Sequence, residues 1–96
     1  MTGDKRVTIY GDEYCAYCTA ARMLFTRKGV PFEDVLVSGD AQRRDEMQAR
    51  TGGRRSVPQI FVGDTHVGGF NELTALDKSG GLDKLLAAEA VGEETH

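Results

Sequence analysis

An apolar strand-like run, a helical pattern and a second apolar run follow one another near the start of the chain. The first run covers residues 7–10, and apolar side chains recur at helical spacing over residues 15–28. Pro31 opens the second run, residues 32–37. A strand, a helix and a strand in this order almost always form a right-handed crossover between parallel strands. This segment therefore restricts the chain to a parallel or mixed sheet with a helix packed on it.

The rest of the chain alternates in a similar way. Asp40 and Asn71 each stand where a helix would begin, and both side chains can accept hydrogen bonds from first-turn N–H groups. The expected elements are a helix over 41–51, hairpin strands over 57–62 and 65–67, a helix over 71–79, and a short helix lined by Leu82, Leu85 and Leu86. The predicted order is β-α-β-α-β-β-α-α. We expect an α/β fold in which helices flank a four-stranded mixed sheet.

Length and charge narrow the function classes. The 96 residues predict a single domain over 1–96, with an ordered core over about 5–88 and a frayed tail over 89–96. The net charge of −3 offers no basic face for nucleic acid. No apolar stretch approaches the length of about 20 residues that crosses a membrane. Residues 1–6 are polar and do not resemble a signal peptide, so we expect a cytoplasmic protein.

Cys15 and Cys18 are the two cysteines of the chain, and they stand at the predicted start of the first helix. In a reducing compartment such a pair is catalytic or metal-binding more often than structural. Four-ligand zinc would need two further ligands, and the chain offers only His66 and His96, so we expect no metal. A helix N-terminus favours a thiolate. We therefore predict that Cys15 is the nucleophile and that Cys18, one turn later, resolves the mixed disulfide.

Four short motifs resemble those of glutaredoxins of the dithiol class. They are Cys15-Ala16-Tyr17-Cys18, Ser56-Val57-Pro58, Gly68-Gly69 and Gly80-Gly81-Leu82, in this order along the chain. The resemblance covers about residues 5–88. It implies the thioredoxin fold and a glutathione-dependent thiol–disulfide oxidoreductase. Its substrates would be disulfide-bearing or glutathionylated proteins, with glutathione as co-substrate and a monomer as the working unit.

The resemblance also implies where glutathione binds. A cis peptide between Val57 and Pro58 would leave the Val57 backbone free to pair with the cysteinyl part of glutathione. The start of the helix near Asn71 would hold the γ-glutamyl carboxylate, and Arg44 would reach the glycine carboxylate. The implied contacts are Tyr17, Arg44, Ser56, Val57, Pro58, Gly69, Phe70 and Asn71. A surface aromatic at Tyr17, a plain edge-strand proline and solvated arginines are the simpler alternatives.

Two positions depart from the pattern of that family. Many relatives have proline where this chain has Ala16, and in the family a small residue there accompanies [2Fe–2S] binding between two subunits. A glutathione-ligated cluster in a homodimer is therefore an alternative function. Many relatives have lysine where this chain has Asp12, whose charge should raise the pKa of the thiol and weaken glutathione capture. Arg44, Arg54 or Arg55 could compensate, or another thiol or a thioredoxin-type reductase could supply the electrons.

Overall fold

The computed structural model describes residues 6–94, and for residues 89–94 it describes the backbone alone. Its elements are β1 (Val7–Gly11), α1 (Ala16–Arg27), β2 (Phe32–Leu36), α2 (Ala41–Thr51), β3 (Gln59–Val62), β4 (Thr65–Gly68), α3 (Phe70–Lys78) and α4 (Gly81–Glu94). The predicted order of strands and helices is confirmed. Across the described residues, no helix has the length and hydropathy that a membrane crossing needs.

The four strands form one mixed sheet in the order β2-β1-β3-β4. β1 runs parallel to β2, with Ile9 opposite Asp34, and antiparallel to β3, with Ile9 opposite Ile60. β3 and β4 form the predicted hairpin. β1 and β3 are the central strands, and every residue of β3 is buried. This explains why both read as continuous apolar runs, since a strand covered on both faces has no polar side.

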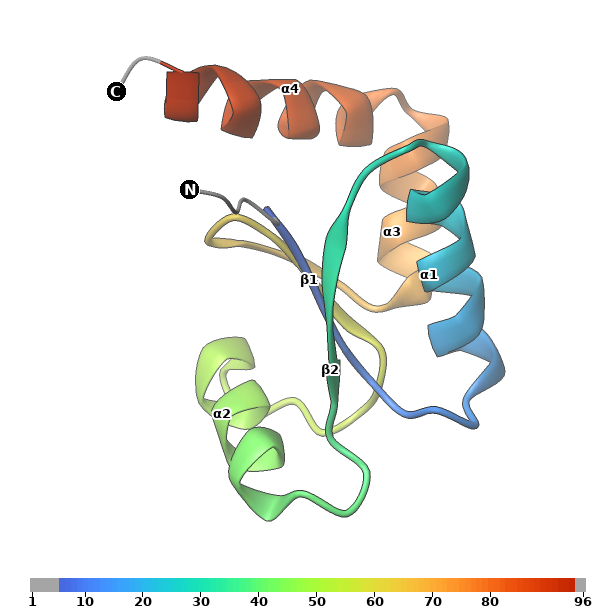
Figure 1. The fold of residues 1–96 in the computed structure, drawn as a ribbon, viewed down its shortest axis with the longest axis vertical. Helices are drawn as coiled ribbons and strands as arrows, with labels where there is room; N and C mark the ends of the chain where they lie inside the picture. The colour runs from blue at the N-terminus through green and yellow to red at the C-terminus, as the bar shows by residue number, and fades with distance from the viewer. Residues whose placement is uncertain (1–5, 95–96) are drawn as a thin grey trace.

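Helices cover both faces of the sheet (Figure 1). α1 and α3 lie on one face, and α2 lies alone on the other. Between the sheet and α1 and α3 lies the larger core, made of Val7, Ile9, Ala21, Leu24, Phe25, Ile60, Val62, Leu73 and Leu82. Under α2 lies the smaller core, made of Tyr10, Val35, Val37, Met47 and Phe61. Alternate residues of β1 supply the two cores, as the pleat of a strand requires.

Three element boundaries differ from the sequence prediction for local reasons. β3 begins at Gln59 rather than at residue 57, because Pro58 has no N–H to donate to a neighbouring strand. The prediction that Asn71 caps α3 is wrong: Gly69 is the cap, and its N–H donates to Glu72 Oε1 at 2.8 Å. α4 is longer than the short helix that was predicted and continues to Glu94, while residues 95–96 lie outside the described residues.

Candidate active site

Cys15 stands at the N-cap of α1, where the chain turns from the loop after β1 into the helix. Its backbone is extended, with φ −91° and ψ 123°, and its side chain is partly exposed. The first turn of a helix leaves N–H groups without intrahelical partners. Burial by itself raises the pKa of the Cys15 thiol. Hydrogen bonding from the backbone and thiol of Cys18 and from the Tyr17 N–H outweighs burial and lowers the pKa below the ordinary 9.0.

Asp12 opposes this activation of Cys15. Its carboxylate raises the pKa of the Cys15 thiol, in the direction that the sequence predicts, but its effect is smaller than that of the hydrogen bonds. The pKa of the Cys15 thiol is thus still lowered in spite of the acidic residue before it. A partly exposed thiol with a lowered pKa has the properties of a nucleophile.

Cys18 differs from Cys15 in every one of these respects. Its side chain is 0% exposed, because it points from α1 toward the sheet. Burial, together with the hydrogen bond and negative charge of Cys15, raises the pKa of Cys18 to about 11. The Asp12 N–H donates to Cys18 Sγ at 3.4 Å, and this contact works in the opposite direction. Both cysteines are free thiols in this structure.

The loop before β3 contains a cis peptide bond between Val57 and Pro58. Gln59, which is fully buried, holds the loop from behind: its Nε2 donates to the Ser56 carbonyl at 2.9 Å and to Ser56 Oγ at 3.1 Å. Gln59 Oε1 in turn pairs with His66 Nε2 at 2.7 Å. Since the amide oxygen can only accept, His66 carries a proton on Nε2.

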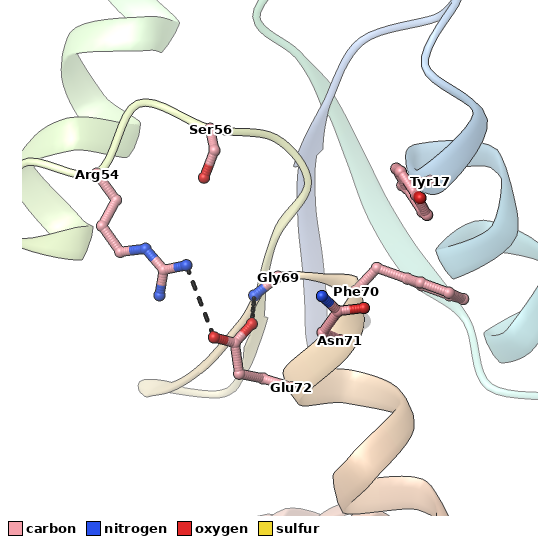
Figure 2. A pocket seen from close by; sticks show the side chains of 7 residues that line it. All are labelled: Tyr17, Arg54, Ser56, Gly69, Phe70, Asn71 and Glu72. Atoms are coloured by element: carbon pink, nitrogen blue, oxygen red, sulfur yellow. Dashed lines mark hydrogen bonds and ion pairs between the residues drawn. The ribbon is translucent and has the colours of Figure 1, made fainter.

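A pocket of about 290 Å³ lies between α1, this loop and the start of α3 (Figure 2). Its lining residues are Tyr17, Arg54, Ser56, Gly69, Phe70, Asn71 and Glu72. Tyr17 comes from the first turn of α1, two residues after Cys15, and its ring lies 5.8 Å from that of Phe70. The pocket therefore adjoins the turn that carries the reactive thiol.

Charge in the pocket is concentrated on one pair. Arg54 Nη2 lies 3.8 Å from Glu72 Oε2, and Figure 2 shows the two side chains pointing toward each other. Hydrogen bonds from the Gly69 N–H and from its own N–H lower the pKa of the Glu72 carboxyl, and Arg54 adds to this effect. Glu72 is therefore ionised near neutral pH, and the pocket holds one fixed charge of each sign.

Comparisons with known proteins agree with this geometry. The glutaredoxin family model matches residues 7–67. Glutaredoxin 3 of Escherichia coli is 49% identical over 80 residues, which are 83% of this chain and 95% of that protein. The solution structure of a glutaredoxin from Brucella melitensis is 45% identical, with a TM-score of 0.73, and the match covers 85% of this chain and 88% of that one. The chain belongs to the glutaredoxin family.

A more distant structure supports the fold alone. Buckwheat glutaredoxin in a glutathione complex has a TM-score of 0.80 at 23% identity, covering 88% of this chain and 79% of that one. The thioredoxin-like fold that the motifs implied is thus confirmed. A glutaredoxin that carries both Cys15 and Cys18 is a thiol–disulfide oxidoreductase, and the different environments of its two thiols suit that chemistry.

The structure of this glutaredoxin gathers five of the eight expected ligand contacts around one pocket: Tyr17, Ser56, Gly69, Phe70 and Asn71. The three others do not line the pocket, and their contacts with glutathione stay predictions. Val57 packs against the smaller core, and Pro58 is buried, with its carbonyl oxygen 3.5 Å from where a Cβ at Gly69 would stand. Arg44 does not line the pocket, and its Nη2 instead lies 3.5 Å from the Val37 carbonyl.

Arg54 and Glu72 line the pocket although the sequence motifs do not imply either residue as a contact. The sequence suggests Arg54 only as a substitute for a missing lysine. Glu72 follows Gly69 by three residues, which is the spacing of an acidic residue that reaches back to a helix cap. That spacing was the available signal for Glu72.

Proposed function

We propose that this glutaredoxin reduces protein disulfides and protein–glutathione mixed disulfides with glutathione as its reductant, as a monomer in the cytoplasm. The pocket beside Tyr17 is the observation that carries the proposal, because it joins a helix N-terminus and an arginine to the turn that holds Cys15. Glutathione carries two carboxylates and one ammonium group, which suit such a pocket. The glutathione complex of the buckwheat protein, which has the same fold, supports this choice of ligand.

The exchange follows from the two thiol environments. The Cys15 thiolate attacks the glutathione sulfur of a mixed disulfide between glutathione and a substrate protein, which forms a disulfide between Cys15 and glutathione and releases the substrate thiolate. A second glutathione thiolate then attacks this mixed disulfide, which releases oxidised glutathione and restores Cys15. For a protein disulfide, the Cys15 thiolate attacks one of the two substrate sulfurs and forms a mixed disulfide with it. The Cys18 thiolate then attacks Cys15 Sγ and releases the substrate as a dithiol, and two glutathione molecules later reduce the Cys15–Cys18 disulfide.

The pocket offers partners for both charged groups of the glutamyl unit of glutathione, its carboxylate and its ammonium group. The N–H groups of Phe70 and Asn71, in the first turn of α3, would receive the carboxylate. Asn71 has no charge for the ammonium group, and Glu72 supplies one nearby. Arg54, rather than Arg44, is the arginine within the pocket that can pair with the carboxylate of the glycine residue.

Serine substitutions at the two cysteines test the proposal most directly. Cys15→Ser should abolish all exchange, because the attacking sulfur is lost. Cys18→Ser should keep the removal of glutathione from a glutathionylated protein but lose the reduction of protein disulfides. Both activities are measured with glutathione as the electron donor, recycled by glutathione reductase. Thr19→Ser, an exposed change on the same helix, is the matched control and should keep both activities.

Three results would contradict this assignment. Loss of both activities in Cys18→Ser would show that Cys15 cannot turn over alone. Full activity in Cys15→Ser would place the nucleophile elsewhere. Equal rates with glutathione and with an unrelated small thiol would remove glutathione as the specific reductant and would favour another electron donor.

Glu72→Gln tests the pocket itself. Glutamine keeps the acceptor for the Gly69 N–H but removes the charge, so α3 should stay capped while the ammonium group of glutathione loses its partner. An exposed charge pair contributes about 0.2–1 kcal/mol. The KM for glutathione should rise up to about fivefold at constant kcat, and Glu33→Gln on β2 should leave it unchanged. A lower KM would mean that Glu72 competes with the ligand for Arg54.

The iron–sulfur alternative stays a prediction from Ala16, and none of the contacts described above favours it. Protein purified with glutathione present should be colourless if exchange is its main activity. Visible absorbance together with a dimeric mass would instead indicate a cluster shared by two subunits.

A further inference from the structure

Arg22 connects three parts of the active-site region, although it lies outside the pocket. It is one turn beyond Cys18 on the same helix. Its Nη2 donates to the Asp12 carbonyl at 3.1 Å, and its Nε pairs with Asp34 Oδ1 on β2 at 3.0 Å. Its side chain is only 17% exposed, which is low for an arginine. A largely buried guanidinium held at both ends is a fixed charge rather than a mobile surface group.

Gly11 shows how close this charge lies to the second thiol. A Cβ at Gly11 would be 3.0 Å from Cys18 Sγ and 3.2 Å from Arg22 Nη2. The sulfur and the guanidinium therefore approach the same bare stretch of β1 backbone from α1. Asp12 contacts both of them, because its N–H donates to Cys18 Sγ at 3.4 Å and its carbonyl accepts from Arg22.

We propose that Arg22 is a positioning residue for Cys18: anchored by Asp34, it holds the Asp12 N–H against Cys18 Sγ and places a positive charge beside the thiolate that resolves a mixed disulfide. In that step the Cys18 thiolate attacks Cys15 Sγ, the Cys15–Cys18 bond forms, the bond from Cys15 to the substrate sulfur breaks, and the substrate leaves as a thiolate. The two cysteines are oxidised and the substrate disulfide is reduced. The inference rests on the roles proposed for the two cysteines but not on glutathione as the reductant.

The surroundings of Cys18 explain why its thiolate needs a positive charge beside it. Burial, with the hydrogen bond and negative charge of Cys15, raises the pKa of Cys18 to about 11, so few molecules carry its thiolate near neutral pH. The part of this rise that comes from the negative charge of Cys15 disappears once Cys15 is in a mixed disulfide. The Asp12 N–H and the Arg22 charge lower the pKa of Cys18 and remain in place, while Asp34 pairs with Nε of the same guanidinium. Arg22 therefore matters most at the moment of resolution.

The test isolates that step with dithiobis(nitrobenzoate), an aromatic disulfide whose thiolate is coloured. Cys15 attacks it and releases a first coloured thiolate, and Cys18 then displaces the second. Loss of the Arg22 charge reduces the thiolate fraction of Cys18 about tenfold for each unit of pKa, while the nucleophilicity rises about threefold. Arg22→Gln should therefore slow the second release at least threefold, move its pH profile to higher pH, and change the first release less than twofold.

Two further variants distinguish a charge effect from a loss of structure. Arg22→Lys keeps the charge and should restore most of the second-release rate and the pH profile. Arg43→Gln removes an arginine that pairs with Asp40 on α2 and should behave as wild type. A second release within twofold of wild type in Arg22→Gln, an unshifted pH profile, or equal slowing of both releases would overturn the proposal. Because the reagent replaces glutathione, failure of the glutathione assay would not affect this result.

Discussion

On one face of the sheet, the side chains packed against α1 and α3 form an apolar core, whereas polar groups border the smaller core on the face under α2. The Tyr10 hydroxyl donates to Glu46 Oε2 at 2.5 Å and accepts from Arg50 Nη1 at 3.0 Å. The Arg50 guanidinium lies 4.0 Å from the centre of the Phe61 ring, which stacks on His66. The packing of α1 and α3 on the first face is thus stabilised by apolar area buried from water. The packing under α2 on the second face is stabilised also by hydrogen bonds and by contacts between charged groups and rings.

The difference matters because each face supports one half of the active site. The larger core presses α1 onto the sheet, and this sets the depth of Cys18. The hydrogen bonds of Gln59 on the other side hold the loop of Ser56 and Pro58. Apolar burial stabilises strongly but without direction, while a hydrogen bond contributes less and fixes orientation. We therefore expect changes on the first face to reduce stability most, and changes on the second to be smaller and sensitive to pH.

Phe25→Ala should have the largest effect. Phe25 is 0% exposed in the larger core, and truncation of such a side chain costs about 3–5 kcal/mol. The free energy of unfolding, measured by urea denaturation, should fall by that amount. Met23→Ala, an exposed change on the same helix, should cost under about 0.5 kcal/mol. A loss below about 1 kcal/mol for Phe25→Ala would show that this face does not carry most of the stability.

Tyr10→Phe should have an intermediate effect. The change keeps the ring in the smaller core and removes only the hydroxyl between Glu46 and Arg50. Loss of such a hydrogen bond costs about 1 kcal/mol, which urea denaturation resolves. Tyr14→Phe, at a side chain that is 90% exposed, is the control and should leave stability unchanged. If Tyr10→Phe cost as much as Phe25→Ala, the contrast between the two faces would fail.

The sequence predicted the fold well because its strongest signals are local. The alternation of strand and helix patterns, broken by glycine and proline, predicted the element order and the mixed sheet. The motif around Pro58 implied the cis peptide, which the structure contains. The cap of α3 was mispredicted because asparagine is a better capping residue than glycine. In the structure the cap of α3 lies two residues before Asn71, and the Gly69 N–H at the cap donates to the Glu72 carboxylate.

The active site was predicted only in part, because some of its contacts join residues that are far apart along the chain. Tyr17 lies in a motif and Phe70 directly follows one, so their place at the pocket could be expected. Arg22 belongs to no motif, and its contacts reach Asp12 and Asp34, ten and twelve residues away along the chain. The buried pairing of Gln59 with His66 likewise depends on the register of the β3–β4 hairpin. Long-range contacts of single polar side chains leave no periodic pattern that a sequence reading can detect.

His66 should give the smallest effect, visible in the pH dependence of stability. Burial lowers the pKa of His66 below its ordinary 6.5, and the positive charges of Arg54 and Arg50 add to this, while Glu72 opposes it. Between the lowered pKa of His66 in the folded protein and the ordinary pKa of 6.5 in the unfolded chain, the unfolded chain binds more protons than the folded one. Stability must therefore fall as pH falls through this range. The contribution of His66 is present above about pH 6.5 and is lost as the pH drops through the lowered value.

His66→Gln separates this contribution from the titration of the carboxyl groups, which is common to both proteins. Glutamine can still donate to Gln59 Oε1 but does not titrate. Urea midpoints measured from about pH 8 to about pH 5 should fall more steeply for wild type than for His66→Gln. Parallel curves would show that proton binding at His66 is the same in both states. A steeper curve for the variant would reverse the sign and would mean that the polar face stabilises the charged imidazole.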